Sequence, residues 1–306
     1  MASMPKVSVI IPTFNRAKLV CRAIDSVLVQ SYSNIECVVI DDASTDNTFN
    51  ILKDRYGSKI HVIRNKRNMD KSYSRNKGVI ETDADYVCFL DSDDILTKDS
   101  IQKRVECILD KDDCSASFGL RLDIVKGKVR KSCNNFWGSL KKGDIITLEQ
   151  YLNNKNWLST NSFLIPRNTM LKYGMFNEKL YNQEDVELFI RLLLNIKFYF
   201  CGTVVTHIFN DADHRARNNF KKIIEQGTML SASLESNPDV VRKLGNRLEK
   251  IKQLEYIEIL SALYHSGRYS EFRNMFLSGL SKGVSPKNFK FYRRLVLSYF
   301  RSGGCP

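Results

Sequence analysis

The chain has 306 residues, of which 43% are hydrophobic and 26% are charged, as in ordinary folded proteins. This length accommodates one large α/β domain with an appendage, and the composition excludes a chain that is disordered over most of its length. The formal net charge of +13 favours anionic partners, such as nucleic acids, anionic lipids or phosphorylated substrates.

The sequence predicts a cytoplasmic protein. Its first residues, MASMPKVSVIIP, contain no separate hydrophobic region of a signal peptide, and no window approaches the roughly 20 apolar residues of a membrane span. The eight cysteines form no CxxC pairs. We therefore expect reduced thiols in the core instead of a disulfide framework.

Strand-like and helix-like segments alternate through the first hundred residues. The apolar run at 7–11 ends at Pro12 and predicts a buried strand, and further strands are expected at 35–40, 60–63 and 86–90. Between them we expect helices at 16–29, from a cap at Ser44-Thr45-Asp46 to about 56, at 72–81 and at 101–109. This order predicts an α/β fold, with a mostly parallel, Rossmann-like sheet and helices on both faces.

The pattern of predicted strands and helices changes twice in the second half of the chain. Weak alternation over 115–131 indicates antiparallel strands or a hairpin, followed by a helix at 148–154, a strand at 161–165, an amphipathic helix at 183–195 and a strand at 197–207. Beyond about 215 helices dominate, including a helical hairpin at 256–276 and a basic amphipathic helix at 287–301. We expect a catalytic domain at 4–212 and a helical extension at 213–306, which could bind a membrane or form a homo-oligomer.

Three polar clusters follow predicted strands, namely 12–16, Asp41-Asp42 and 91–94. Ligands of parallel α/β sheets bind at the carboxyl ends of the strands, so these clusters predict one binding site. Carboxylates as dense as those in Asp91-Ser92-Asp93-Asp94 repel each other unless a cation or hydrogen bonds compensate. A single Mn²⁺ or Mg²⁺ completed by diphosphate oxygens would suit them, and helix capping is the alternative for both acidic clusters.

Five segments then resemble a known family. VSVIIPTFNR, VVIDDASTDNT, YSRNKG, FLDSDD and NQEDVELFIRLL occur in this order and are similar to the family 2 glycosyltransferases of the GT-A fold, over roughly residues 5–210. The resemblance implies a nucleotide-diphosphate-sugar donor, a divalent metal and inversion at the anomeric carbon. The sequence departs from the family pattern at Gln183, where a glycine usually precedes the Glu-Asp pair, and in the segment before YSRNKG, which lacks glycine.

The resemblance also implies roles for individual residues. Asp185 would be the catalytic base, with its neighbour Glu184 as the second candidate, and Asp93 would ligate the metal. Asp91 would lie near the ribose or the metal, and His214 is favoured over His207 as a further metal or diphosphate ligand. The donor site would comprise Pro12, Thr13, Phe14, Asn15, Arg16, Asp42 against the base (most often uracil), Asn68, Arg75, Asp91 and Ser92.

These expectations give a coherent reaction. A positioned carboxylate takes the proton of an acceptor hydroxyl, and the metal neutralises the leaving diphosphate. We expect transfer of a hexose or N-acetylhexosamine from a UDP-sugar to a saccharide acceptor. The acceptor would be lipid-linked in O-antigen, capsule or lipooligosaccharide assembly, at the inner face of the cell membrane. The alternative function is that of a catalytically inactive relative that binds nucleotide sugars as a scaffold.

Other classes fit less well. The segment after the first predicted strand has no glycine, which argues against a nucleotidyltransferase and a dinucleotide dehydrogenase. Acidic strand ends do not suit a polyanion, so we expect no nucleic-acid partner despite the positive net charge. The surplus positive charge instead suits an anionic membrane surface.

Overall fold

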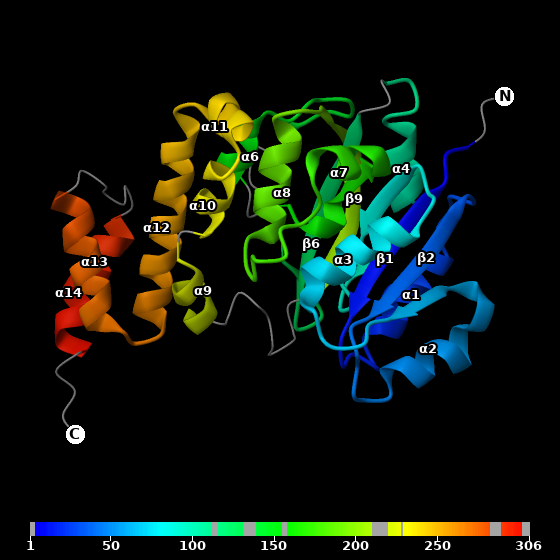
Figure 1. Ribbon diagram of the computed structural model, residues 1–306, viewed down its shortest axis with the longest axis horizontal. Helices are drawn as coiled ribbons and strands as arrows, with labels where there is room; N and C mark the ends of the chain where they lie inside the picture. Colours follow the sequence, from blue (N-terminus) through cyan, green and yellow to red (C-terminus); the bar gives the residue numbers. More distant parts are fainter. Residues whose placement is uncertain are drawn as a thin grey trace. The chain divides into compact units, whose positions relative to one another are not determined.

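The computed structural model describes residues 4–111, 115–130, 139–154, 158–209, 220–227, 229–281 and 289–301 (Figure 1). The chain divides into two compact units. The N-terminal unit takes residues up to 179 together with 184–212, and the C-terminal unit takes 180–183 together with residues from 213 onward. Each unit has its own hydrophobic core.

The N-terminal unit begins with the expected alternation of strands and helices. Its elements up to residue 106 are β1 (Val7–Thr13), α1 (Val20–Leu28), β2 (Ile35–Asp41), α2 (Thr48–Tyr56), β3 (His61–Arg64), α3 (Asp70–Glu81), β4 (Tyr86–Phe89), β5 (Ile95–Leu96) and α4 (Ser100–Glu106). The later elements are β6 (Ala116–Val125), β7 (Lys128–Arg130), α6 (Leu148–Asn154), β8 (Phe163–Pro166), α7 (Arg167–Tyr173), α8 (Glu184–Leu193) and β9 (Phe198–Phe209).

The described strands form one nine-stranded mixed sheet in the order β3-β2-β1-β4-β8-β6-β9-β5, with β7 paired to β6. The strands β3, β2, β1 and β4 are parallel to one another, as are β6 and β9. Strand β8 is antiparallel to both β4 and β6, and it joins the parallel N-terminal half to the later strands. The predicted α/β fold is confirmed, as is the hairpin around residues 126–128.

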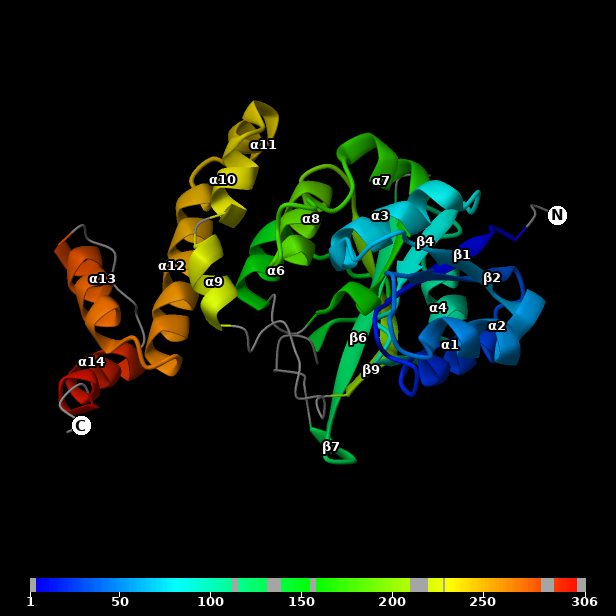
Figure 2. The ribbon, with the colours of Figure 1, turned by 60° about the horizontal axis from the view of Figure 1, so that its bottom comes forward.

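Helices cover both faces of the sheet, as expected (Figure 2). Helices α1, α2 and α4 bury Ile24, Leu52 and Val105 in one core with Val9 of β1. Helix α3 packs on the opposite face, where Gly78 lies so close to β1 that an added Cβ would meet the Ile10 side chain at 2.4 Å. Gly78 of the YSRNKG segment therefore permits the close approach of α3 to the sheet.

Two local expectations need correction. Helix α2 begins at Thr48 with Asn47 at the N-cap position and no side-chain bond from Asn47, but Asp46 Oδ1 accepts from the Thr48 N–H at 2.9 Å, so of residues 44–46 only Asp46 caps the helix. Ser44 and Thr45 instead bond to the loop after β1, as described below. Residues 161–162 belong to a short 3-10 helix, so strand β8 begins two residues later than expected.

The C-terminal unit contains α9 (Phe220–Gln226), α10 (Met229–Glu235), α11 (Pro238–Leu244), α12 (Arg247–His265), α13 (Tyr269–Ser281) and α14 (Phe289–Arg301). Helices α12 and α13 form the predicted helical hairpin, with its turn at 266–268. Their core joins Leu260, Phe272 and Phe276 to Phe291 of α14. Among the described residues, no helix combines the length and the apolar composition that a bilayer crossing requires.

Candidate functional site

The predicted polar clusters meet at one edge of the sheet. Thr13 at the end of β1 pairs in register with Asp41 at the end of β2, and Asp41 pairs with Arg64 at the end of β3. Asn15 (φ 51°), within the first cluster, and Ala43 (φ 61°), directly after the second, adopt left-handed backbone angles despite having a side chain. Asp70 (φ 68°), the first residue of α3, and Gln183 (φ 61°), directly before Glu184, do so as well. Such conformations cost energy and concentrate at functional sites, which marks this edge as the candidate site.

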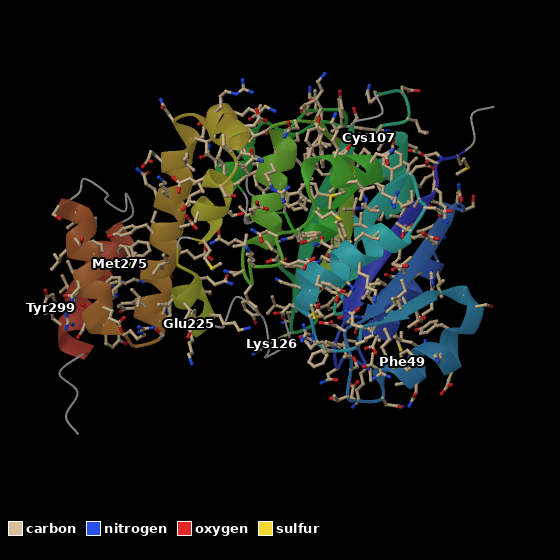
Figure 3. All side chains as sticks on the ribbon, in the orientation of Figure 1. Phe49, Cys107, Lys126, Glu225, Met275 and Tyr299 are labelled. Atoms are coloured by element: carbon tan, nitrogen blue, oxygen red, sulfur yellow. The ribbon has the colours of Figure 1, made fainter. Side chains whose placement is uncertain are left out.

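A cavity of about 730 Å³ opens beside the ends of β2 and β3. It is lined by Phe14, Ala43, Ser44, Thr45, Asp46, Phe49, Asn50, Arg64, Lys66, Arg67 and Asn68. The Arg64 guanidinium lies 4.5 Å from the ring centroid of Phe49, which is labelled on α2 in Figure 3. Aromatic rings, amides and cations on one wall suit a ligand that combines a flat ring with phosphate groups.

Asn15 ties the loops after β1 and β2 together. Its Oδ1 accepts hydrogen bonds from the backbone N–H groups of Thr45 (2.8 Å) and Asp46 (3.2 Å). Its own N–H donates to Ser44 Oγ at 3.0 Å, and the N–H of Arg16 donates to Thr48 Oγ1 at 3.0 Å. Asn15 and Arg16 therefore hold one wall of the cavity in shape.

Asp42 is buried and does not line the cavity. Its Oδ1 accepts hydrogen bonds from the Asn65 side chain (2.7 Å) and from the Met69 N–H (2.9 Å), so it holds the segment after β3 against the end of β2. Thr13 is also buried, and its Oγ1 has no hydrogen-bond partner among the described residues. A buried hydroxyl without a partner is costly, and a bound ligand would relieve that cost.

The three aspartates after β4 have different surroundings. Asp94 is buried and accepts from the Asn161 side chain and from the Phe209 N–H, both at 2.9 Å, so it is structural. The side chains of Asp91 and Asp93 keep 38% and 18% of their surface exposed. Asp93 lies 3.7 Å from the Arg16 guanidinium. Two accessible carboxylates two residues apart could hold a Mg²⁺ or Mn²⁺ ion whose remaining ligands are substrate oxygens.

Arg75 connects this acidic cluster to the start of helix α8. Its buried guanidinium donates to Asp91 Oδ1 at 2.6 Å and to Glu184 Oε1 at 3.0 Å, and it lies 5.2 Å from the Phe176 ring centroid. Lys71, one helical turn earlier, lies 2.6 Å from the same Glu184 oxygen. Glu184 is buried, and its Oε1 contacts both Lys71 and Arg75, so the position of its carboxylate is fixed.

Asp185 follows directly and differs from its neighbour. Its side chain is half-buried, and its Oδ1 accepts from the N–H of Val186 at 2.8 Å. Burial raises the pKa of Asp185 above the ordinary aspartate value, and the charge of Glu184 raises it further, although Lys71 and Arg75 oppose both. A carboxylate with a raised pKa is a stronger base than an ordinary aspartate.

Within the described part of the chain, no three His, Cys, Asp or Glu side chains gather into a cluster that could hold a metal by itself. A metal at Asp91 and Asp93 would therefore depend on ligand oxygens from the substrate. His214 lies outside the described residues. His207 pairs with Ile95 in the sheet, and burial lowers its pKa.

Comparisons with known proteins identify the family to which the chain belongs. The sequence profile described as Glycosyl transferase family 2 matches residues 8–179, which is more than half of the chain. The protein belongs to glycosyl transferase family 2. That match contains all the candidate residues except Glu184, Asp185 and His214.

Relatives in the family carry related names. TuaG of Bacillus subtilis, a glycosyltransferase named for teichuronic acid biosynthesis, is 37% identical over 116 residues, 37% of this chain and 46% of TuaG. GlyG of Streptococcus pneumoniae is 25% identical over 185 residues, 56% of this chain and 58% of GlyG. The chain thus spans about half the length of these two relatives.

A longer match and a solved structure extend beyond the family profile. A GalNAc(5)-diNAcBac-PP-undecaprenol beta-1,3-glucosyltransferase of Campylobacter jejuni is 26% identical over 276 residues, 87% of this chain and 82% of that one. The crystal structure of S. aureus TarS 1-349 in complex with UDP-GlcNAc superposes with a TM-score of 0.63 at 18% identity, over 97% of this chain and 92% of TarS 1-349. The GT-A fold expected from the sequence is thereby supported over the chain.

The structure groups most of the family-implied residues. Phe14 and Asn68 line the cavity, Asn15 and Arg16 shape its wall, and Pro12, Thr13, Asp42 and Ser92 lie buried at the same edge. Lys71 and Phe176 escaped the sequence analysis. The spacing of Lys71 and Arg75, four residues apart on one helix face, was a signal that could have indicated Lys71.

Proposed function

We propose that this family 2 protein is an inverting glycosyltransferase that moves a hexose or N-acetylhexosamine from a UDP-sugar to a hydroxyl of a saccharide acceptor. One observation carries the proposal. The Arg75 guanidinium bonds both Asp91 and Glu184, so it joins the acidic cluster after β4 to the Glu184-Asp185 pair at one sheet edge. A metal-binding acid and a basic carboxylate so close together suit a single displacement at a sugar carbon.

The cavity supports a nucleotide donor. Phe14 offers a ring against which a base can stack, and Arg64, Lys66 and Arg67 offer positive charge for phosphates. The Thr13 hydroxyl and the Asp42 carboxylate are buried at the same sheet edge, and the family resemblance implies that both residues contact the nucleoside. TarS, whose fold this chain shares, was solved with UDP-GlcNAc bound, which favours a UDP-sugar here.

Asp185 would act as the general base. Its raised pKa lets it accept the acceptor proton as the new glycosidic bond forms and the bond to the diphosphate breaks. Glu184 does not suit this role, because Lys71 and Arg75 both contact its Oε1 and hold it in place. Glu184 instead fixes the start of α8, and Arg75 orients Asp91 toward the donor.

Asp93 and Asp91 would hold the metal. A bound Mg²⁺ or Mn²⁺ supplies positive charge to the departing diphosphate oxygens. Arg16, 3.7 Å from Asp93, adds a second positive charge at the same place. Both aspartates lie on the short turn that β4 and Asn161 hold in position, since the Asp91 N–H donates to Asn161 Oδ1 at 3.1 Å.

We expect the substitution Asp93→Ala to abolish metal-dependent release of UDP. Without this carboxylate, Asp91 alone would have to hold the cation between the protein and the diphosphate. The measurement is release of the nucleoside diphosphate from a panel of UDP-, GDP- and dTDP-sugars with Mn²⁺, Mg²⁺ or EDTA. Asp99→Ala, at the N-cap of α4, is the control. Unchanged release in Asp93→Ala would contradict the metal assignment. Absence of release and of nucleotide binding in the wild-type chain would instead favour an inactive scaffold.

The acceptor is proposed to be lipid-linked. The Campylobacter jejuni relative is named for an undecaprenyl-diphosphate-linked acceptor. Helix α14 presents an exposed stripe of Tyr292, Arg293, Val296 and Tyr299, the last labelled in Figure 3, while Phe291 and Ser298 face its own unit. Aromatic and basic residues on one helix face suit an anionic membrane surface. The protein would then act at the cytoplasmic face of a cell membrane.

The double variant Arg293→Glu/Val296→Glu should reduce co-sedimentation of the full chain with vesicles of phosphatidylglycerol and phosphatidylcholine. It replaces a positive and an apolar side chain by negative ones on the exposed stripe and leaves the buried Phe291 in place. Vesicles of phosphatidylcholine alone are the control. If variant and wild type sediment equally with anionic vesicles, α14 is not the membrane-binding element.

A further inference from the structure

The segment that leads into the Glu184-Asp185 pair belongs to the C-terminal unit. Residues 180–183 group with the helical extension, and Glu184 returns to the N-terminal unit as the first residue of α8. Each of these four residues has a specific environment there. Leu180 is buried, the Lys222 ammonium lies 3.6 Å from the Tyr181 ring centroid, and the Asn182 N–H donates to Gln226 Oε1 at 3.1 Å.

Glu258 of α12 accepts hydrogen bonds from both amide side chains of this segment. Asn182 Nδ2 donates to Glu258 Oε1 at 3.3 Å, and Gln183 Nε2 donates to Glu258 Oε2. An ionised carboxylate is a strong acceptor for two such donors. Glu258 is therefore the group of α12 that holds Asn182 and Gln183 together.

Gln183 occupies a left-handed conformation (φ 61°) where family members usually have glycine. A residue with a side chain is strained at this backbone angle, so the conformation persists only if its surroundings hold it. The hydrogen bond from Nε2 to Glu258 is a contact that glycine could not make. It compensates the strained backbone immediately before the proposed base.

We infer that Glu258 is a positioning residue for Asp185, acting through Gln183 and the backbone that starts helix α8. This inference rests on the proposed function, because it assumes that Asp185 is the general base. It assigns a catalytic purpose to the C-terminal helices, since α12 would set where the first turn of α8 begins. A base displaced by about 1 Å can lose on the order of 100-fold in rate.

The test compares Glu258→Gln and Gln183→Ala with wild type in the full chain. We expect kcat to fall about 10- to 100-fold in each, with the KM for the UDP-sugar within twofold, because the cavity lies elsewhere. The acid limb of the kcat–pH profile should shift, since the surroundings of Asp185 change. Glu258→Asp should recover part of kcat. Glu249→Gln, an exposed position on the same helix, is the matched control and should behave as wild type.

The double variant shows whether Glu258 and Gln183 affect kcat through the same hydrogen bond or independently of each other. If both residues act through one hydrogen bond, Glu258→Gln/Gln183→Ala should lose no more activity than the worse single variant. Losses that multiply, a kcat within twofold of wild type in Glu258→Gln, or a loss confined to KM would each overturn the inference.

Amide hydrogen exchange over residues 180–190 gives a readout without activity. Exchange should accelerate in Glu258→Gln and stay unchanged in Glu249→Gln. An active wild type with unchanged exchange in Glu258→Gln would overturn the positioning role alone. A wild type without transferase activity would overturn the proposed function, whatever the exchange shows.

Discussion

Asp185→Asn should lower kcat by about 10²- to 10⁴-fold while the protein stays folded, because an amide cannot accept the acceptor proton. The pKa of Asp185 is raised by burial and by the charge of Glu184, so its ionised form is disfavoured in the folded chain. The folded-state pKa lies above the unfolded one, and this group's contribution to stability falls as the pH rises through that window. Asparagine should therefore not lower the melting temperature at neutral pH.

The raised pKa of Asp185 should also determine how kcat of the wild type depends on pH. Asp185 acts as a base only when it is deprotonated, so kcat should fall as the pH drops through its raised pKa, and thus at a higher pH than an ordinary aspartate would give. The measurement is transfer activity against pH together with thermal unfolding of both proteins. Asp239→Asn, on the surface of α11, is the control. More than a tenth of wild-type kcat in Asp185→Asn would contradict its role as base.

Arg75→Met should destabilise the fold by up to roughly 3–5 kcal/mol, because it removes one partner of a buried ion pair and leaves the buried Glu184 carboxylate with Lys71 alone. Arg75 and Glu184 are both buried, with side chains only 2% and 3% exposed. Arg75→Lys should not restore the wild type, since an ammonium lacks the planar fork that bonds Asp91 and Glu184 together.

Urea unfolding measures this loss. Arg55→Met is the matched control, because Arg55 pairs with Asp25 at the surface, where the two side chains are 54% and 46% exposed. Exposed pairs contribute about 0–1 kcal/mol, so the two variants should differ severalfold in lost stability. Equal losses in Arg75→Met and Arg55→Met would show that the network does not support the fold. A double variant Arg75→Met/Glu184→Gln should recover part of the loss.

Local sequence patterns predicted the parallel half of the sheet. Residues 7–11 and 35–40 are short apolar runs, each followed by a polar cluster, and buried strands with functional loops have this pattern. The Glu184-Asp185 pair was found by its place in a family motif at the start of an amphipathic helix. The sequence could not predict how close this pair lies to Asp91. That distance depends on pairing between strands far apart in the chain, such as β4 with β8.

The different roles proposed for Glu184 and Asp185 could not be predicted from the sequence either. Both residues are acids in the first turn of a helix, and composition treats them alike. Only the placement of Lys71 and Arg75 beside Glu184 distinguishes a fixed carboxylate from one with a raised pKa. Likewise, Ser44 and Thr45 have the composition of a helix cap, yet they bond to Asn15 in the neighbouring loop.

The Arg75–Glu184 hydrogen bond joins residues 109 positions apart in the chain. Closing so long a loop is entropically costly, and contacts of this kind form late when a chain folds. The candidate site is therefore assembled only after α3 and α8 have both docked on the completed sheet. A chain interrupted during synthesis before residue 184 would carry the acids after β2 and β4 but neither Glu184 nor the proposed base Asp185, so it should be unable to transfer a sugar.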